Sequence, residues 1–160
     1  PDLEVQCIKE DSPLGRGGAF KHGYHMAGIN DPLVYASNGD IFTTVSFDDL
    51  CTMHSNKQAM ATIALTPMIS PYGVVDTHED TVTGFKEKPQ LPYWINSGAY
   101  LLNKETIDLF PDRGDHETNV FPDLAQKGKL AALKSHAFWR SLETLKDLDI
   151  IGDFLKTNKN

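Results

Sequence analysis

The sequence has little cysteine and no long apolar run. Its 160 residues include two cysteines, Cys7 and Cys51, and neither belongs to a Cys-x-x-Cys pair. This spacing is unlike that of a disulfide-rich secreted domain, so we expect both thiols to be reduced and half-buried in a cytoplasmic protein. No apolar run approaches the roughly 20 residues that a membrane-spanning helix requires, so we expect no membrane partner.

Positive charge is scarce as well. Lysine and arginine number 15 against 22 aspartates and glutamates, which gives a formal net charge of −7. Because a polyanion is repelled by such a balance, we expect no nucleic acid polymer as a partner. A small anionic ligand remains compatible, since one local site can be positive on an acidic protein. The sequence also has no nucleophile elbow and no Ser-His-Asp or Cys-His signature, so nothing indicates covalent catalysis.

The remaining composition is that of one ordinary globular domain, with 40% hydrophobic and 23% charged residues. Apolar patterns predict strands over residues 3–8, 33–36, 59–66, 72–75, 82–85, 95–102, 130–133 and 137–139. Helices are predicted over residues 14–27, 46–54, 106–110, 119–127 and 144–155. The first third alternates strand and helix, which predicts parallel strands, with 33–36 as a buried one. The middle is rich in strands, with a hairpin around residues 76–80, so the expected fold is α/β with a mixed sheet.

A glycine cluster stands where a predicted strand gives way to a helix. In the stretch EDSPLGRGGAF, Gly15, Gly17 and Gly18 fall within four positions. Glycines there let backbone N–H groups approach a ligand without an intervening side chain. The spacing fits neither of the common phosphate-binding glycine motifs. A ligand loop and a turn with tight helix packing therefore both remain open.

Polar residues follow two other predicted strands. Asn38, Gly39 and Asp40 come after LVYAS, and ligands of open α/β sheets bind beyond the carboxyl ends of strands. An aspartate there can hold Mg²⁺, although Asn-Gly is also a common plain turn. Glu87 and Lys88 follow VTGF, where lysine could neutralise a phosphate and glutamate could accept hydroxyl hydrogen bonds. The alternative for that pair is a solvated charged loop before a proline.

Two further acidic or amide side chains occupy unusual positions. Asn96 lies within the strand-like run INSGAY, whose interior glycine indicates a bulge or a close backbone approach. Glu143 precedes Thr144, which is a plausible N-cap of the last helix. Glu143 is either a metal-binding carboxylate or an exposed acid.

The order of these motifs resembles one known family. PLGRGGA, LVYASNGD, SPYGVV, VTGFKEKP, INSGAYLL and WRSLETLKDL, from Glu10 to Leu148, resemble the sugar-phosphate nucleotidyltransferases, also called nucleotide-sugar pyrophosphorylases. The similarity is greatest to mannose-1-phosphate guanylyltransferases and glucose-1-phosphate nucleotidyltransferases. It implies a Rossmann-like α/β domain with a mixed, mostly parallel sheet. It also implies transfer of a nucleotidyl group from a nucleoside triphosphate to a sugar 1-phosphate. The sugar phosphate attacks the α-phosphate in line with help from Mg²⁺, and pyrophosphate leaves.

The resemblance also implies roles for individual residues. Lys88 is expected to meet the sugar phosphate as a catalytic residue, together with the catalytic Asp40. Asp40 and Glu143 are expected to bind the metal ion. The sugar is expected to contact Gly73, Glu87 and Asn96. The nucleotide is expected to contact Leu14, Gly15, Arg16, Gly17, Gly18, Asn38 and Gly39.

The sequence departs from the family pattern in three places. The GGxGTRL-type signature that opens the family domain and holds the triphosphate is missing. We therefore expect residues 1–160 to form the C-terminal two-thirds of that domain, without its N-terminal βα units. Arg16 replaces a threonine of many members. Several members carry an aspartate at the position of Ser141, and others at that of Glu143.

The missing signature leaves a second function open, that of a non-catalytic sugar-nucleotide-binding or regulatory subunit. It also makes a complementary N-terminal segment or a second copy of the chain a possible partner.

Overall fold

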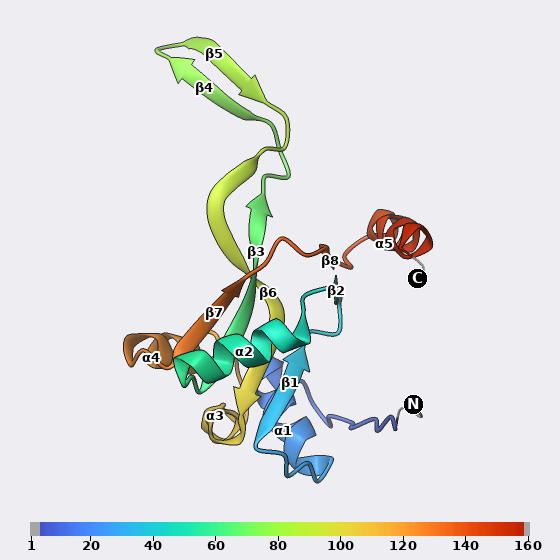
Figure 1. Cartoon of the computed structure of the whole chain (residues 1–160). Coiled ribbons are helices and arrows are strands. Elements are labelled where there is room, and N and C mark those ends of the chain that lie inside the picture. The colour runs from blue at the N-terminus through green and yellow to red at the C-terminus, as the bar shows by residue number, and fades with distance from the viewer. Residues whose placement is uncertain (1–3, 159–160) are drawn as a thin grey trace. The chain divides into compact units, whose positions relative to one another are not determined.

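The computed structural model describes residues 4–158, which form an α/β protein (Figure 1). The helices are α1 (Gly15–Met26), α2 (Phe47–Lys57), α3 (Lys104–Leu109), α4 (Val120–Gln126) and α5 (Leu145–Thr157). The strands are β1 (Leu33–Ser37), β2 (Ile41–Thr43), β3 (Ala61–Ile69), β4 (Val74–His78), β5 (Thr81–Lys86), β6 (Gln90–Asn103), β7 (Leu130–Lys134) and β8 (Trp139–Ser141). Within the described residues, no helix is both long and apolar enough to cross a membrane.

Four strands form the main sheet in the order β1-β6-β3-β7. β1 pairs antiparallel with β6, with Leu33 opposite Asn103 and Ser37 opposite Ala99. The arrows of β3 and β7 point the same way (Figure 1), so the predicted mixed sheet is confirmed. The prediction of a buried parallel strand at 33–36 is wrong, because β1 lies at the sheet edge and Tyr35 is 42% exposed.

The chain divides into two compact units. The first comprises residues 4–38, 46–63 and 99–133, and the second comprises residues 39–45, 64–98 and 134–158. The core of the first unit is an apolar cluster contributed by α1, β3, β6, α3 and α4: Tyr24, Ala61, Tyr100, Leu102, Ile107, Phe110, Phe121 and Leu124. The predicted capping of α2 is confirmed, since the Ser46 side chain accepts a hydrogen bond from the Asp49 amide at 3.1 Å.

The glycine cluster packs the start of α1 against a loop. The amides of Gly17 and Gly18 both donate to the carbonyl of Gly114, at 3.0 and 3.3 Å. A Cβ on Gly18 would lie 2.6 Å from the carbonyl oxygen of Asp112, closer than real Cβ contacts come. Gly15 has a φ of +75°, in the region that favours glycine. The tight-packing interpretation of this cluster is confirmed, and the nucleotide role stays a prediction.

A buried histidine lies next to this contact, since a Cβ on Gly17 would be 3.2 Å from the Cβ of His116. The His116 ring is fully buried, stacks on Phe110 at 4.6 Å and meets the edges of Tyr100 and Phe121. Neither ring nitrogen has a hydrogen-bond partner within residues 4–158. Burial lowers the pKa of His116 below its usual value of 6.5, although Glu117 and Asp115 nearby oppose that effect. His116 is therefore neutral at pH 7.

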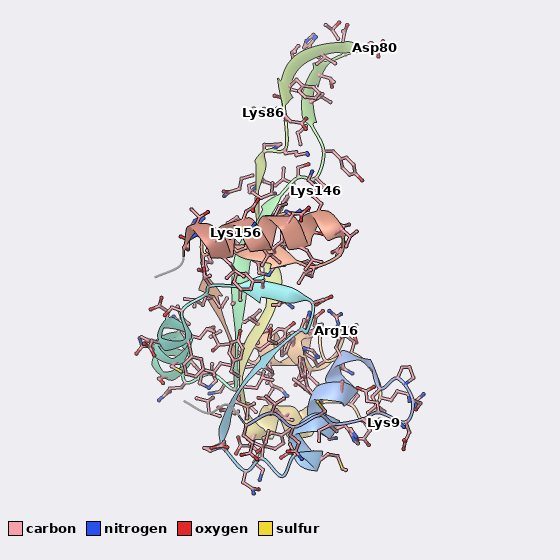
Figure 2. All side chains as sticks on the ribbon, turned by 90° about the vertical axis from the view of Figure 1, so that its right-hand side faces the viewer. Lys9, Arg16, Asp80, Lys86, Lys146 and Lys156 are labelled. Carbon is pink, nitrogen blue, oxygen red and sulfur yellow. The ribbon has the colours of Figure 1, made fainter. Side chains whose placement is uncertain are left out.

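The second unit contains two short ladders and α5. β2 pairs antiparallel with β8, and β4 with β5. Phe138 stacks on Phe154 of α5 at 4.0 Å, and Phe42 meets both rings edge-on, which attaches α5 to the β2–β8 ladder. The predicted hairpin is confirmed, with Asp80 at its tip (Figure 2).

Two predictions fail at the start of the chain. Residues 4–8 form no strand, while Leu3 lies outside the described residues, and Val5 is 73% exposed. Alternation alone makes no strand, because a strand must also pair with a neighbour. Both cysteines are free, as expected; Cys51 is half-buried, whereas Cys7 is exposed.

The packing of Gly18 predicts a sharp contrast within one helix. Gly18→Ala should lower the free energy of unfolding by about 1–3 kcal/mol, because the new methyl group meets fixed backbone atoms. Gly23→Ala is the matched control, since a Cβ there meets nothing within 4 Å. It should raise stability by up to about 1 kcal/mol, because alanine favours helix. Urea unfolding of both variants measures the difference, and equal effects would contradict the packing.

His116 predicts a loss of stability in mild acid. The pKa of His116 is lower in the folded protein than its usual value of 6.5 in the unfolded chain. The free energy of unfolding is therefore highest above pH 6.5 and decreases as the pH falls below that value, because the unfolded chain binds the proton more readily. His116→Leu, which has no group to protonate, should show a smaller drop in Tm between pH 7 and pH 5. At pH 7 it should be at least as stable as the parent, because two unpaired polar atoms are removed. His78→Asn, an exposed position at the hairpin tip, controls for the loss of a histidine, and a pH profile matching the parent's for His116→Leu would refute the prediction.

Candidate functional site

The predicted site residues fall in both units. The first unit holds Leu14, Arg16, Asn38 and the three glycines of the cluster. The second unit holds Gly39, Asp40, Gly73, Glu87, Lys88, Asn96 and Glu143. Two pairs within the second unit come together in space.

The first pair is Asp40 and Glu143, at one end of the β2–β8 ladder. Ile41, the first residue of β2, lies opposite Ser141, the last residue of β8. Asp40 and Leu142, the residues just outside the two strands, are therefore at the same end of the ladder. The Leu142 amide extends the pairing by donating to the Asp40 carbonyl at 2.7 Å. Sequence analysis missed β2, yet this strand is what brings residues some 100 positions apart to one place. The Ser141 hydroxyl donates to the Glu143 carboxylate at 3.2 Å.

Asp147 in the first turn of α5 organises the segment that carries Glu143. Its Oδ1 accepts from Nε and Nη2 of Arg140, at 2.6 and 2.5 Å. Its Oδ2 accepts from the Thr144 amide and hydroxyl, both at 2.8 Å, and from the Glu143 amide at 3.3 Å. Hydrogen bonds from Thr144 and Arg140 lower the pKa of Asp147 to about 2. The carboxylate is therefore ionised at every physiological pH.

The second pair is Gly73 and Glu87, at the base of the β4–β5 hairpin. A Cβ on Gly73 would lie 2.4 Å from the Phe85 ring and 3.2 Å from Oε2 of Glu87. The ends of the exposed Phe85 and Glu87 side chains thus lie close to the Gly73 backbone. Lys88 follows with a φ of +45°, unusual for a residue with a side chain, and is exposed. The geometry agrees with a shared role for Gly73 and Glu87, and their ligand stays a prediction.

Asn96 supports a local irregularity in β6. Its Oδ1 accepts from the Gly98 amide at 2.9 Å, and Gly98 has a φ of +77°. Between them, the Ser97 carbonyl accepts from the indole Nε1 of Trp139 at 2.8 Å. The positive φ of Gly98 makes this part of β6 irregular, while the close backbone approach and the contact of Asn96 with a sugar stay predictions.

In the first unit, Arg16 is already paired. Its guanidinium forms ion pairs with Asp115 and Glu117, and Glu117 also accepts from the Tyr100 hydroxyl at 2.9 Å. Burial opposes ionisation of Asp115, but hydrogen bonds from the Glu117 amide and Arg16 hold its pKa below the usual value. Two carboxylates thus offset the positive charge of Arg16. The suggested phosphate contact of this side chain would have to compete with them.

The β2–β8 end adjoins an open pocket of about 430 Å³. Its lining includes Ile69, Trp139, Arg140, Ser141 and Glu143. No group of three or more histidine, cysteine or carboxylate side chains among residues 4–158 is arranged to hold a metal ion. Asp40 and Glu143 supply two carboxylates, and proteins often bind Mg²⁺ through one or two carboxylates plus substrate phosphates and water. Their role as metal ligands stays a prediction.

Sequence analysis did not identify Asp147 or Arg140. The signal was present, because Thr144-x-x-Asp147 has the spacing of a capping box, and the structure contains that box. Nothing in the spacing shows that the same carboxylate also binds Arg140 and the Glu143 amide.

Comparison with known proteins identifies the family. The model of the family described as nucleotidyl transferase matches residues 2–157. The chain belongs to the nucleotidyl transferase family. The mannose-1-phosphate guanyltransferase beta-A of Xenopus laevis is 29% identical over 152 residues. The mannose-1-phosphate guanylyltransferase of Mycobacterium tuberculosis is 30% identical over 155 residues. The resemblance predicted from the motifs is confirmed.

The structural comparison supports the same family. HddC from Yersinia pseudotuberculosis superposes with a TM-score of 0.65 at 25% identity, covering 91% of this chain and 64% of its own. Both sequence relatives match over 91% of this chain, which spans only 42% of each relative's length. The chain thus aligns with part of a nucleotidyl transferase.

Proposed function

We propose that the gene product containing this chain transfers a nucleotidyl group from a nucleoside triphosphate to a sugar 1-phosphate, giving a nucleotide sugar and pyrophosphate. The observation that carries the proposal is the β2–β8 pairing. In a member of the nucleotidyl transferase family, it brings Asp40 and Glu143 to one end of one ladder. The names of the sequence relatives favour a guanine nucleotide and mannose 1-phosphate as the first substrates to test.

The reaction needs charge neutralisation more than bond-making groups. An anionic sugar phosphate attacks an anionic α-phosphate in line, so the protein contributes chiefly positioning and electrostatic stabilisation. Asp40 and Glu143 would hold Mg²⁺, which neutralises charge on the reacting phosphates when bound. Lys88 contributes a positive charge to the sugar phosphate, and the carboxylate of Glu87 accepts hydrogen bonds from sugar hydroxyls. Gly73 leaves room beside Glu87, and Asn96 is a further sugar contact.

The nucleotide contacts are assigned to the glycine cluster and the turn after β1. Gly17 and Gly18 use their amides on Gly114, so any contact of theirs with a base is one of close packing. Leu14, Gly15 and Arg16 precede them, while Asn38 and Gly39 follow β1. We place the reaction in the cytoplasm, where nucleotide triphosphates and reduced thiols coexist.

The alternative is a sugar-nucleotide-binding or regulatory subunit without catalysis. It uses the same binding residues. Incubating the gene product with GTP, mannose 1-phosphate and Mg²⁺ separates the two. Pyrophosphate release supports the enzyme, whereas nucleotide binding without release supports the subunit. The absence of binding and release across a panel of triphosphates and sugar phosphates would refute both.

Replacing Asp40 tests the metal assignment. Asp40→Asn should slow pyrophosphate release by on the order of 100-fold, which corresponds to about 2.7 kcal/mol of transition-state stabilisation. Asp80→Asn, an exposed carboxylate at the hairpin tip (Figure 2), is the matched control and should leave the rate unchanged. An unaltered rate for Asp40→Asn would show that Asp40 is not a metal ligand of the reaction.

A further inference from the structure

Every backbone amide of the short connection between β8 and α5, residues 142–144, donates a hydrogen bond. The Leu142 amide binds the Asp40 carbonyl, and the amides of Glu143 and Thr144 bind the Asp147 carboxylate. Hydrogen bonds donated by the backbone amides therefore fix this connection at each of its three residues. A loop fixed in this way holds the path of the main chain, although the Glu143 side chain itself is exposed.

Asp147 does more than cap α5. A capping box requires only the bonds between Asp147 and Thr144. Here Oδ1 of the same side chain binds Arg140 through two guanidinium nitrogens. Arg140 belongs to β8, so one carboxylate connects the last strand, the connection and the first turn of α5.

These contacts require a side chain with two acceptor oxygens, which is a carboxylate. All five groups that reach Asp147 are donors, two on Oδ1 and three on Oδ2. An asparagine amide offers one acceptor oxygen and one donor nitrogen. It would leave either Arg140 or the Glu143–Thr144 donors facing another donor. The side chain is only 8% exposed, so water cannot readily replace the lost partner.

We propose that Asp147 is a positioning residue that holds Glu143 beside Asp40 for binding of a divalent cation. This inference rests on the proposed function, because it takes Asp40 and Glu143 as the metal-binding carboxylates. The Ser141 hydroxyl adds a contact to the Glu143 carboxylate itself. An exposed carboxylate on a fixed connection loses less conformational freedom on binding an ion than one on a mobile connection. Loss of Asp147 therefore weakens cation binding although Asp147 does not touch the ion.

The test measures Mn²⁺ binding, with no need for turnover. Electron paramagnetic resonance reports free Mn²⁺ during titration of the gene product and its variants. Asp147→Asn should weaken Mn²⁺ affinity by about 10- to 100-fold, as is usual when a group supporting a metal ligand is lost. Glu143→Gln, which removes the ligand, should weaken it at least as much.

Two further variants separate positioning from helix capping. Ser46→Ala removes the N-cap of α2, so it should cost stability while leaving Mn²⁺ affinity unchanged. Arg140→Gln leaves the Thr144–Asp147 capping box in place but removes the contact with β8. It should weaken Mn²⁺ binding while α5 keeps its cap, and it keeps the proposal testable if Asp147→Asn fails to fold.

The outcomes distinguish this inference from the proposed function. If Glu143→Gln weakens Mn²⁺ binding but neither Asp147→Asn nor Arg140→Gln does, the positioning role is wrong and the metal site stands. If the parent binds no Mn²⁺, or Glu143→Gln binds as tightly as the parent, the metal site fails and the inference with it. Weakening in Ser46→Ala as large as in Asp147→Asn would mean that global stability alone explains the effect.

Discussion

The candidate site depends on the antiparallel pairing of two three-residue strands. Ladders as short as β2 and β8 have little stability by themselves. The second unit supplies support through the stacked rings of Phe138 and Phe154 and through the carboxylate of Asp147, which connects β8 to α5. Apolar packing by Phe154 and hydrogen bonds to Asp147, both residues of α5, thus stabilise the same small ladder. The positions of Asp40 and Glu143 follow from it.

In the first unit, the start of α1 lies very close to a loop. Gly17 and Gly18 have no side chains, so both of their amides can approach and bind the Gly114 carbonyl. The loop residues that follow add ionic contacts with Arg16 and insert His116 among aromatic rings. The two ring nitrogens of His116, which have no hydrogen-bond partner in the described part of the chain, are the least favourable feature of an otherwise well-packed cluster.

Much of the fold could be predicted from local patterns, and the failures share one cause. Ser46 and Thr144 marked helix starts because capping is a local property of the chain. Residues 4–8 have the alternation of a strand but pair with none of the strands that the structure describes, and 33–36 has the apolar run of a buried strand but lies at an edge. β2 was missed because three residues carry too little pattern. Pairing is decided by distant parts of the sequence, which local periodicity does not contain.

The site, like the fold, could be predicted where local sequence decides and not where distant residues decide. Motif order indicated which residues to consider, and the structure brings Asp40 to Glu143 and Gly73 to Glu87. The role of Asp147 was hidden because its spacing to Thr144 describes a common cap, whereas its bonds to Arg140 depend on where β8 ends. Arg16 was expected at a ligand, yet its nearest charges are Asp115 and Glu117, which lie about 100 residues away in the sequence.

The shared carbonyl of Gly114 also has a kinetic consequence. Amides in the first turn of a helix normally have no partner within that helix and exchange their hydrogens with water quickly. The Gly17 amide is an exception, because Gly17 is buried and its amide is bonded to Gly114, outside α1. Its exchange rate therefore reports on the opening of the loop around Gly114 and not on fraying of α1. This one backbone amide thus probes the opening of the contact between α1 and the loop.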